Sequence, residues 1–97
     1  MTEKQFENKI KEFLKSYNIW FMKVWGGGYQ KAGIPDILAC VNGRFVAIEI
    51  KGSSGKPTEL QKYNIKKINE SNGVGIILYP KDFERFKLLI LDLLRRW

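Results

Sequence analysis

Apolar residues recur every three or four positions along three stretches of the chain, a spacing that predicts three amphipathic helices. The first covers residues 2–17 and opens with a T-x-x-Q capping box at 2–5. The second covers 57–72 and has the same box at 58–61. The third covers 82–97, and its first residue is an aspartate that can cap it.

Four shorter segments predict strands because they are rich in β-branched and aromatic or other apolar residues. They are Ile19–Trp25, Ile37–Val41, Arg44–Ile50 and Gly75–Tyr79. The Asn42–Gly43 pair between the second and third favours a tight hairpin, since a type I′ turn needs a positive φ at both central residues. The order α-β-β-β-α-β-α predicts an α/β fold with a central mixed four-stranded sheet and flanking helices.

The hairpin turn determines which residues of its two strands face each other. With residues 42–43 as the loop, Asp36 faces Glu49, and directly opposed side chains lie ~4.5–5.5 Å apart at Cβ. Lys51 lies two residues beyond Glu49 and therefore joins the same face. The other strand residues are largely apolar on both faces. We therefore expect strands that are buried on both sides, with this charged trio at the rim of the core.

Composition and charge narrow the possible chemistry. The 97 residues suit a single domain over 1–97, and 44% of them are hydrophobic. A net charge of +7 favours a phosphate-rich or otherwise acidic partner. Since the chain has no histidine and one cysteine, it excludes triads with histidine, His-ligated zinc and internal disulfides. No segment looks like a signal peptide or a membrane span, so a cytoplasmic location without membrane contact is expected.

The expected pair of carboxylates indicates a metal site. Two acids that face each other in a partly dry place must share a proton or bind a cation. Carboxylate oxygens suit Mg²⁺, which often completes its shell with substrate phosphate. On a basic protein the natural substrate is a phosphodiester, and Lys51 would stabilise the negative charge that develops during hydrolysis. Mg²⁺ is therefore the expected cofactor, with Mn²⁺ as a substitute.

At these residues the sequence resembles the PD-(D/E)xK nuclease superfamily. Pro35-Asp36 and Glu49-Ile50-Lys51 match its core signature, and the wider string begins with Gly33. Together with Gln61 and Glu7, these motifs are most similar to the stand-alone phage and bacterial VRR-NUC family over about residues 3–80. The resemblance implies a restriction-endonuclease-like core and a metal-dependent deoxyribonuclease in a bacterial or phage-infected cell.

The resemblance also implies roles for individual residues. Asp36 and Glu49 match the metal ligands, with the backbone carbonyl of Ile50 as a third, and Lys51 matches the catalytic lysine. Glu7 matches an acidic helix residue that orients a water molecule or a second ion at the metal. It has an alternative interpretation as a solvated helix residue paired with its i+4 neighbour, a lysine.

Gln61 and a set of lysines complete the expected site. Gln61 matches an accessory residue that orients neighbouring groups, although it also belongs to a capping box. Lysines in or beside the site-forming loops and the second helix are expected to follow the DNA backbone without reading its sequence. They are Lys23, Lys31, Lys56, Lys62 and Lys66. The glycines at 26–28 are expected to form a loop that approaches DNA.

The last predicted helix is apolar over more than one face, because Leu88 and Leu91 add to its main stripe. A leftover apolar face predicts a homodimer. Stand-alone members of the resembled family look like Holliday junction resolvases, so we expect a structure-selective endonuclease for branched DNA. The alternatives are a nuclease for flaps, free ends or plain duplex, a non-catalytic basic DNA-binding module, and a toxin-like or signalling domain that binds an acidic protein.

Overall fold

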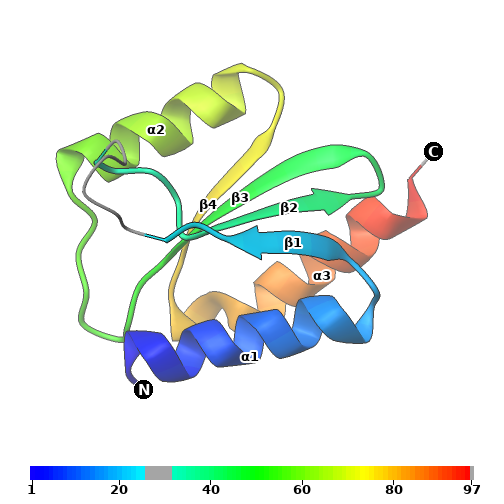
Figure 1. Cartoon of the computed structure of the whole chain (residues 1–97), viewed down its shortest axis with the longest axis horizontal. Helices are drawn as coiled ribbons and strands as arrows, with labels where there is room; N and C mark the ends of the chain where they lie inside the picture. The colour runs from blue at the N-terminus through cyan, green and yellow to red at the C-terminus, as the bar shows by residue number, and fades with distance from the viewer. Residues whose placement is uncertain (26–31, 97) are drawn as a thin grey trace.

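The computed structural model describes residues 1–25 and 32–96 (Figure 1). Its element order confirms the predicted α-β-β-β-α-β-α fold, with one short 3₁₀ turn added before the last helix. The elements are α1 (Glu3–Ser16), β1 (Trp20–Lys23), β2 (Ile37–Val41), β3 (Arg44–Ile50), α2 (Glu59–Glu70), β4 (Val74–Leu78), η1 (Pro80–Asp82) and α3 (Phe83–Arg95).

The strands form one mixed sheet between two layers of helices. The strand order is β1-β2-β3-β4, with antiparallel pairing except between β3 and β4, which are parallel. Figure 1 shows α2 on one face of the sheet and α1 with α3 on the other. The parallel pair requires α2 as its crossover, and this arrangement is consistent with a restriction-endonuclease-like core.

The hairpin between β2 and β3 has the predicted turn and register. Asn42 and Gly43 have φ values of 52° and 81°, as a type I′ turn requires. Val41 pairs with Arg44, and the ladder continues without a bulge to Ile37 and Ile48. The next pair outward, beyond the ladder, is Asp36 and Glu49. The turn chemistry therefore aligns the two acids.

The helix starts confirm two of the three predicted caps. The side chains of Thr2 and Thr58 accept hydrogen bonds from the third helical residue, and Gln5 and Gln61 complete both capping boxes. The prediction for Asp82 was wrong, because its side chain makes no capping hydrogen bond. The 3₁₀ turn at 80–82 leads directly into α3, and the Asp82 carboxylate accepts a bond from the Arg85 side chain at 3.0 Å instead.

The main core lies between the sheet and the layer of α1 and α3. Apolar side chains from α1, α3 and the four strands meet there, and aromatic rings of α1 and α3 pack edge to face. The largest fully buried side chains are Phe6, Ile10, Leu14, Ile37, Ile48, Ile50, Leu78, Ile90, Val41 and Val46. This core fixes one face of β2 and β3, and so leaves their alternate residues on the α2 face.

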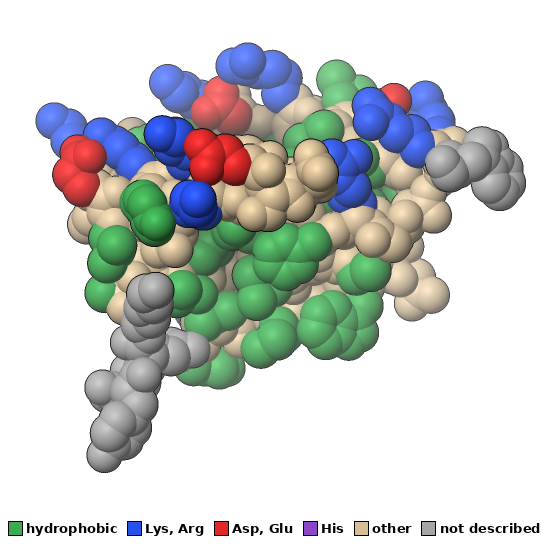
Figure 2. Space-filling model, turned by 90° about the horizontal axis from the view of Figure 1, so that it is seen from above, with side chains coloured by type: hydrophobic (Ala, Val, Ile, Leu, Met, Phe, Trp, Pro, Cys, Tyr) green, Lys and Arg blue, Asp and Glu red, His purple; other side chains and the backbone are tan. Residues whose placement is uncertain are grey.

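The expectation that β2 and β3 are buried on both sides was wrong toward the hairpin turn. On the α2 face, Cys40 is exposed and Phe45 is 48% exposed. The helix α2 contacts β3 and β4, so it leaves the β1 and β2 side of that face uncovered. Figure 2 shows hydrophobic side chains gathered on the surface beside the charged residues. Within the described residues, no helix is long and apolar enough to cross a membrane.

Candidate functional site

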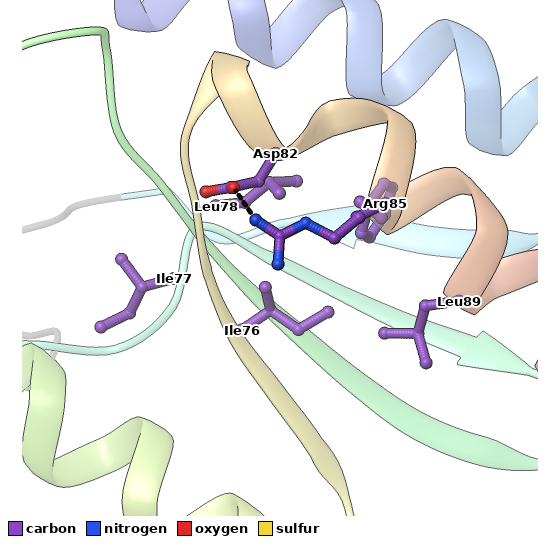
Figure 3. Close-up of a pocket in the computed structure, with 7 residues that line it drawn as sticks. Ile76, Ile77, Leu78, Asp82, Arg85 and Leu89 are labelled. Carbon is purple, nitrogen blue, oxygen red and sulfur yellow. Dashed lines mark hydrogen bonds and ion pairs between the residues drawn. The ribbon is translucent and has the colours of Figure 1, made fainter.

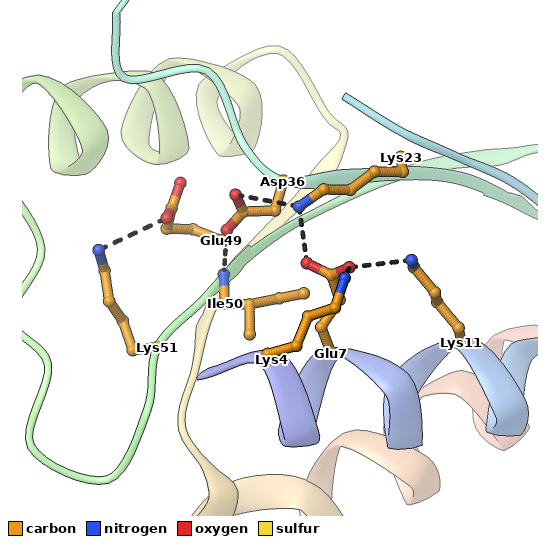
Figure 4. Close-up of polar contacts among 8 residues, drawn as sticks. All are labelled: Lys4, Glu7, Lys11, Lys23, Asp36, Glu49, Ile50 and Lys51. Carbon is orange, nitrogen blue, oxygen red and sulfur yellow. Dashed lines mark hydrogen bonds and ion pairs between the residues drawn. The ribbon is translucent and has the colours of Figure 1, made fainter. Parts of the chain in front are cut away.

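A cleft between β4 and α3 contains little reactive chemistry. Its walls are mostly apolar, and its one ion pair joins Arg85 to Asp82 at 3.0 Å (Figure 3). The polar cluster that contains the predicted trio lies elsewhere, at the end of the β2–β3 hairpin opposite the turn (Figure 4). The site is therefore built on strand ends, which the core holds rigidly.

Asp36 is held at the start of β2 by the neighbouring strand. Its Oδ2 atom accepts a hydrogen bond of 2.8 Å from the backbone amide of Ile50. Its backbone carbonyl accepts a bond of 2.8 Å from the amide of Val24, which follows β1. Its Oδ1 atom lies 3.7 Å from Nζ of Lys23, and the side chain remains 23% exposed. The carboxylate is thus fixed in orientation while one side stays open to solvent.

Glu49 is almost completely buried beside Asp36. The residue is 3% exposed, and its Oε1 atom is buried without a hydrogen-bond partner among the described residues. Its other oxygen lies 3.6 Å from Nζ of Lys51. Burial and then the charge of Asp36 raise the pKa of Glu49 from 4.5 to about 8, against the opposite effect of Lys51. Without a bound cation, Glu49 therefore keeps its proton at neutral pH, because a second negative charge beside Asp36 is unfavourable there.

Lys51 is placed by backbone pairing at the end of the sheet. Its amide donates a bond of 3.0 Å to the carbonyl of Leu78, which continues the pairing of β3 with β4. The residue is 9% exposed, and Figure 4 shows its side chain reaching back toward Glu49. Asp36, Glu49 and Lys51 thus meet as the sequence predicted.

Glu7 forms a second ionic cluster on the α1 side of the strand ends. Its Oε1 atom lies 2.6 Å from Nζ of Lys23, and its Oε2 atom lies 2.9 Å from Nζ of Lys11 and 3.9 Å from Nζ of Lys4. The pairing with Lys11 is the predicted i+4 contact, but the solvated setting was wrong, because Glu7 is 4% exposed. Figure 4 shows Lys23 bridging Glu7 and Asp36.

The two lysine contacts determine the charge of Glu7. Burial by itself would raise the pKa of Glu7, but hydrogen bonds and charge from Lys23 and Lys11 outweigh it and hold that pKa below 4.5. Burial likewise opposes the charge of Lys23, but Glu7 and Asp36 outweigh it and raise the pKa of Lys23 above 10.5. Glu7 is therefore a stable anion and Lys23 a stable cation.

The residues present fit a divalent cation. Glu49 supplies a buried, unpartnered oxygen, Asp36 supplies a partly open carboxylate, and both are hard oxygen ligands of the kind Mg²⁺ prefers. Within residues 1–25 and 32–96, no three acidic, cysteine or histidine side chains converge on one point. A cation here would need further oxygens from backbone, water or substrate.

A family model for archaeal Holliday junction resolvases matches residues 3–96. The chain belongs to the archaeal Holliday junction resolvase family. This is a family of PD-(D/E)xK-type nucleases, which generally use divalent metals, and membership implies a nuclease with branched DNA as its partner. No curated protein and no solved structure gave a significant match. The narrower resemblance to VRR-NUC stays a prediction.

Gln61 occupies a structural position at the start of α2. Its Oε1 atom accepts a bond of 2.9 Å from the amide of Thr58, and its own amide donates to the Thr58 hydroxyl at 3.1 Å. The structure gives it no hydrogen bond to Asp36, Glu49 or Lys51. Its side-chain nitrogen remains the atom with which it could act on the site.

The lysines expected to bind DNA have different surroundings in the structure. Lys62 is exposed and pairs with Glu59 at 3.3 Å, whereas Lys66 is exposed and lies 4.0 Å from Glu70. Lys56 is exposed, and Lys31, like the glycines at 26–28, lies outside the described residues. Sequence reasoning assigned Lys23 to DNA and missed its bridge to Glu7. Predicting this bridge requires the pairing of β1 with β2, and no signal in the sequence specifies that pairing.

Proposed function

We propose that this protein is a Mg²⁺-dependent, structure-selective DNA endonuclease that hydrolyses phosphodiester bonds in four-way junctions. Family membership supports the reaction and the branched substrate. The observation that carries the metal dependence is the buried, unpartnered Oε1 atom of Glu49 beside the Asp36 carboxylate. If both acids are to be ionised, they need more positive charge than the neighbouring side chains provide.

Asp36 and Glu49 hold the cation in this proposal, with the backbone carbonyl of Ile50 as a third donor. Mg²⁺ supplies polarisation of a phosphate oxygen and a lowered pKa of water when bound, and Mn²⁺ can replace it. Lys51 places a positive charge beside the phosphate undergoing attack. Glu7 acts as a positioning residue, because it holds Lys23 against Asp36.

The remaining expected residues have supporting roles in the proposal. Gln61 orients neighbouring groups with its side-chain nitrogen, while four further lysines follow the DNA backbone. These lysines are Lys31, Lys56, Lys62 and Lys66. Lys23 has an indirect role, because it lies against the Asp36 carboxylate. The proposal also keeps a single domain over 1–97, a cytoplasmic location and the narrower VRR-NUC grouping.

A cleavage assay with matched variants tests the proposal. Wild-type protein should cut a labelled four-way junction with Mg²⁺ or Mn²⁺, but not with Ca²⁺ or EDTA. Asp36→Ala and Lys51→Ala should each lower the cutting rate at least about 100-fold, while junction affinity in Ca²⁺ changes little. Glu12→Gln is the control, since it removes an exposed carboxylate of α1 and should leave both quantities unchanged.

Three results would contradict this function. Binding without cutting would indicate a basic DNA-binding module. Equal or faster cutting of flaps or plain duplex would remove junction selectivity. Undiminished cutting by Asp36→Ala would place the reaction at another site.

We also propose that the enzyme is a homodimer that uses an apolar area of the sheet, the sheet patch. The patch consists of Trp20, Met22, Cys40 and Phe45, which share the α2 face of β1, β2 and β3. Trp20 is 63% and Met22 45% exposed, and cross-strand pairing places Cys40 between Trp20 and Phe45. Exposed apolar areas of this kind are uncommon on monomers.

The α3 surface favours a dimer less than the sequence suggested. Leu88 is 66% exposed, but Leu91 is partly buried, and the main stripe of α3 packs into the core. A two-fold dimer through the sheet patch would instead pair the same surface of both subunits. Such a dimer gives two cutting sites to a symmetric junction.

Sedimentation at micromolar concentration tests the dimer and its surface. The double variant Trp20→Glu/Phe45→Glu should convert a dimer into a monomer, whereas Leu88→Glu should leave the dimer intact. Circular dichroism checks that each variant is folded. A monomeric wild type would refute the dimer, and loss of the dimer in Leu88→Glu alone would move the interface to α3.

A further inference from the structure

A cleft of about 370 Å³ with both polar and apolar walls lies directly beyond the ends of β3 and β4. One wall is the loop 53–56, which follows Lys51, and the other is the segment 79–81, which follows β4. The cleft is lined by Ser53, Ser54, Gly55, Lys56, Tyr79, Pro80 and Lys81. None of these residues belongs to the metal-binding pair.

The cleft adjoins the proposed catalytic lysine. A Cβ atom on Gly55 would lie 3.3 Å from Cδ of Lys51, so the loop backbone packs against the Lys51 side chain. The loop is also held in place, since the amide of Gly55 donates to the carbonyl of Gly52 at 3.1 Å and that of Ser53 donates to Met1 at 3.4 Å. The cleft therefore lies next to Lys51 and within reach of a DNA strand bound there.

The polar side chains of the cleft carry two ammonium groups and three hydroxyl groups. Lys56 and Lys81 are exposed, and neither has an acidic side chain within 4.0 Å among the described residues. Nζ of Lys81 lies 5.7 Å above the ring of Tyr79. Two acids nearby in the chain are already paired: Asp82 contacts Arg85 at 3.0 Å, and Glu59 contacts Lys62 at 3.3 Å.

We propose that this cleft binds a backbone phosphate that flanks the scissile phosphate on the strand being cut. Lys56 and Lys81 neutralise that phosphate, and the hydroxyls of Ser54 and Tyr79 are available as donors. The inference rests on the proposed nuclease function, because it assigns part of the same substrate to a second place. Its consequence is positional: one phosphate beside the cut contributes more to binding than phosphates farther away.

Affinity measurements in Ca²⁺ test the charge contribution. The double variant Lys56→Gln/Lys81→Gln should reduce the slope of log affinity against log salt concentration by about 0.9, the value for one phosphate contact on duplex DNA. Between 50 and 200 mM salt this is a change of about threefold. The matched control Lys9→Gln/Lys15→Gln removes two exposed charges from α1 and should change the slope less.

Neutral linkages test the position. A junction series carries one methylphosphonate at a time on either side of the cut. In wild type, one flanking position should weaken binding at least fivefold, and in Lys56→Gln/Lys81→Gln the same linkage should have no effect. A uniform response in wild type, or the same response in both proteins, would overturn the cleft proposal while junction cutting persists. A wild type that does not cut would instead refute the nuclease function.

Discussion

Replacing Glu49 by glutamine tests whether ionising its buried side chain destabilises the folded, metal-free protein. Burial and the neighbouring Asp36 raise the pKa of Glu49 to about 8, against 4.5 for an exposed glutamate. Between these values the folded protein keeps a proton that the unfolded chain has already released. Metal-free stability must therefore fall as the pH rises through this range, and Glu49→Gln should remove that fall.

The size of the effect follows from the same two values. A group that is protonated in the folded state and ionised in the unfolded state gives a slope of about 1.4 kcal/mol per pH unit. The full difference between 4.5 and about 8 corresponds to roughly 5 kcal/mol above pH 8. From pH 5.5 to 7.5 the loss is roughly 3 kcal/mol, or a fall in Tm of roughly 10–20 °C for a domain of this size.

Thermal melts in EDTA across this pH range provide the assay. Wild type should lose Tm steadily, Glu49→Gln should have a flatter profile and the higher Tm at pH 8, and the control Glu12→Gln should behave as wild type. Mg²⁺ at pH 8 should raise the Tm of wild type more than that of Glu49→Gln, because a cation that binds the folded state stabilises it. Parallel profiles of Tm against pH for wild type and Glu49→Gln would refute the claim that ionising Glu49 destabilises the folded state.

Two further predictions concern the elements around the site. Glu7→Gln should lower stability at pH 7 by about 2 kcal/mol in urea titrations, because Lys23 and Lys11 lose their charged partner. Since the pKa of Glu7 is lowered, the wild type should lose this stability advantage over the variant as the pH falls below 4.5. An advantage that persists in acid would contradict the ion pairs. Gly75→Ala should lower stability by about 1–3 kcal/mol, because its Cβ atom would lie 2.9 Å from the Ile65 carbonyl oxygen of α2, and an unchanged urea midpoint would contradict this close packing.

The β2–β3 hairpin could be predicted closely because its determinants are local. Asn42 and Gly43 are adjacent in the chain, and a two-residue turn permits one register between its strands. That register carried Asp36 opposite Glu49 without any knowledge of the rest of the fold. The capping boxes at Thr2 and Thr58 succeeded for the same reason, since each depends on residues three positions apart.

The surroundings of Asp36 could not be predicted, because they depend on contacts between distant segments. Lys23 reaches Asp36 only through the pairing of β1 with β2, and the segment that joins these strands has no turn signal that fixes a register. The failure at Asp82 is different in kind. Two local partners competed for one carboxylate, and the Arg85 side chain, not the helix amides, makes the bond.

The two buried glutamates of the site show why residue type alone does not define a metal ligand. Both are at most 4% exposed, yet the pKa of Glu7 is lowered while that of Glu49 is raised. Each oxygen of Glu7 has a lysine ammonium within 2.9 Å, so a cation that approached it would have to displace that lysine. Glu49 has a single lysine, 3.6 Å from its Oε2 atom, and among the described residues its Oε1 atom has no lysine ammonium within 4.0 Å. If a cation binds as proposed, the lysine arrangement explains why it would bind at Glu49 and Asp36 and not at Glu7, which holds Lys23 in place beside them.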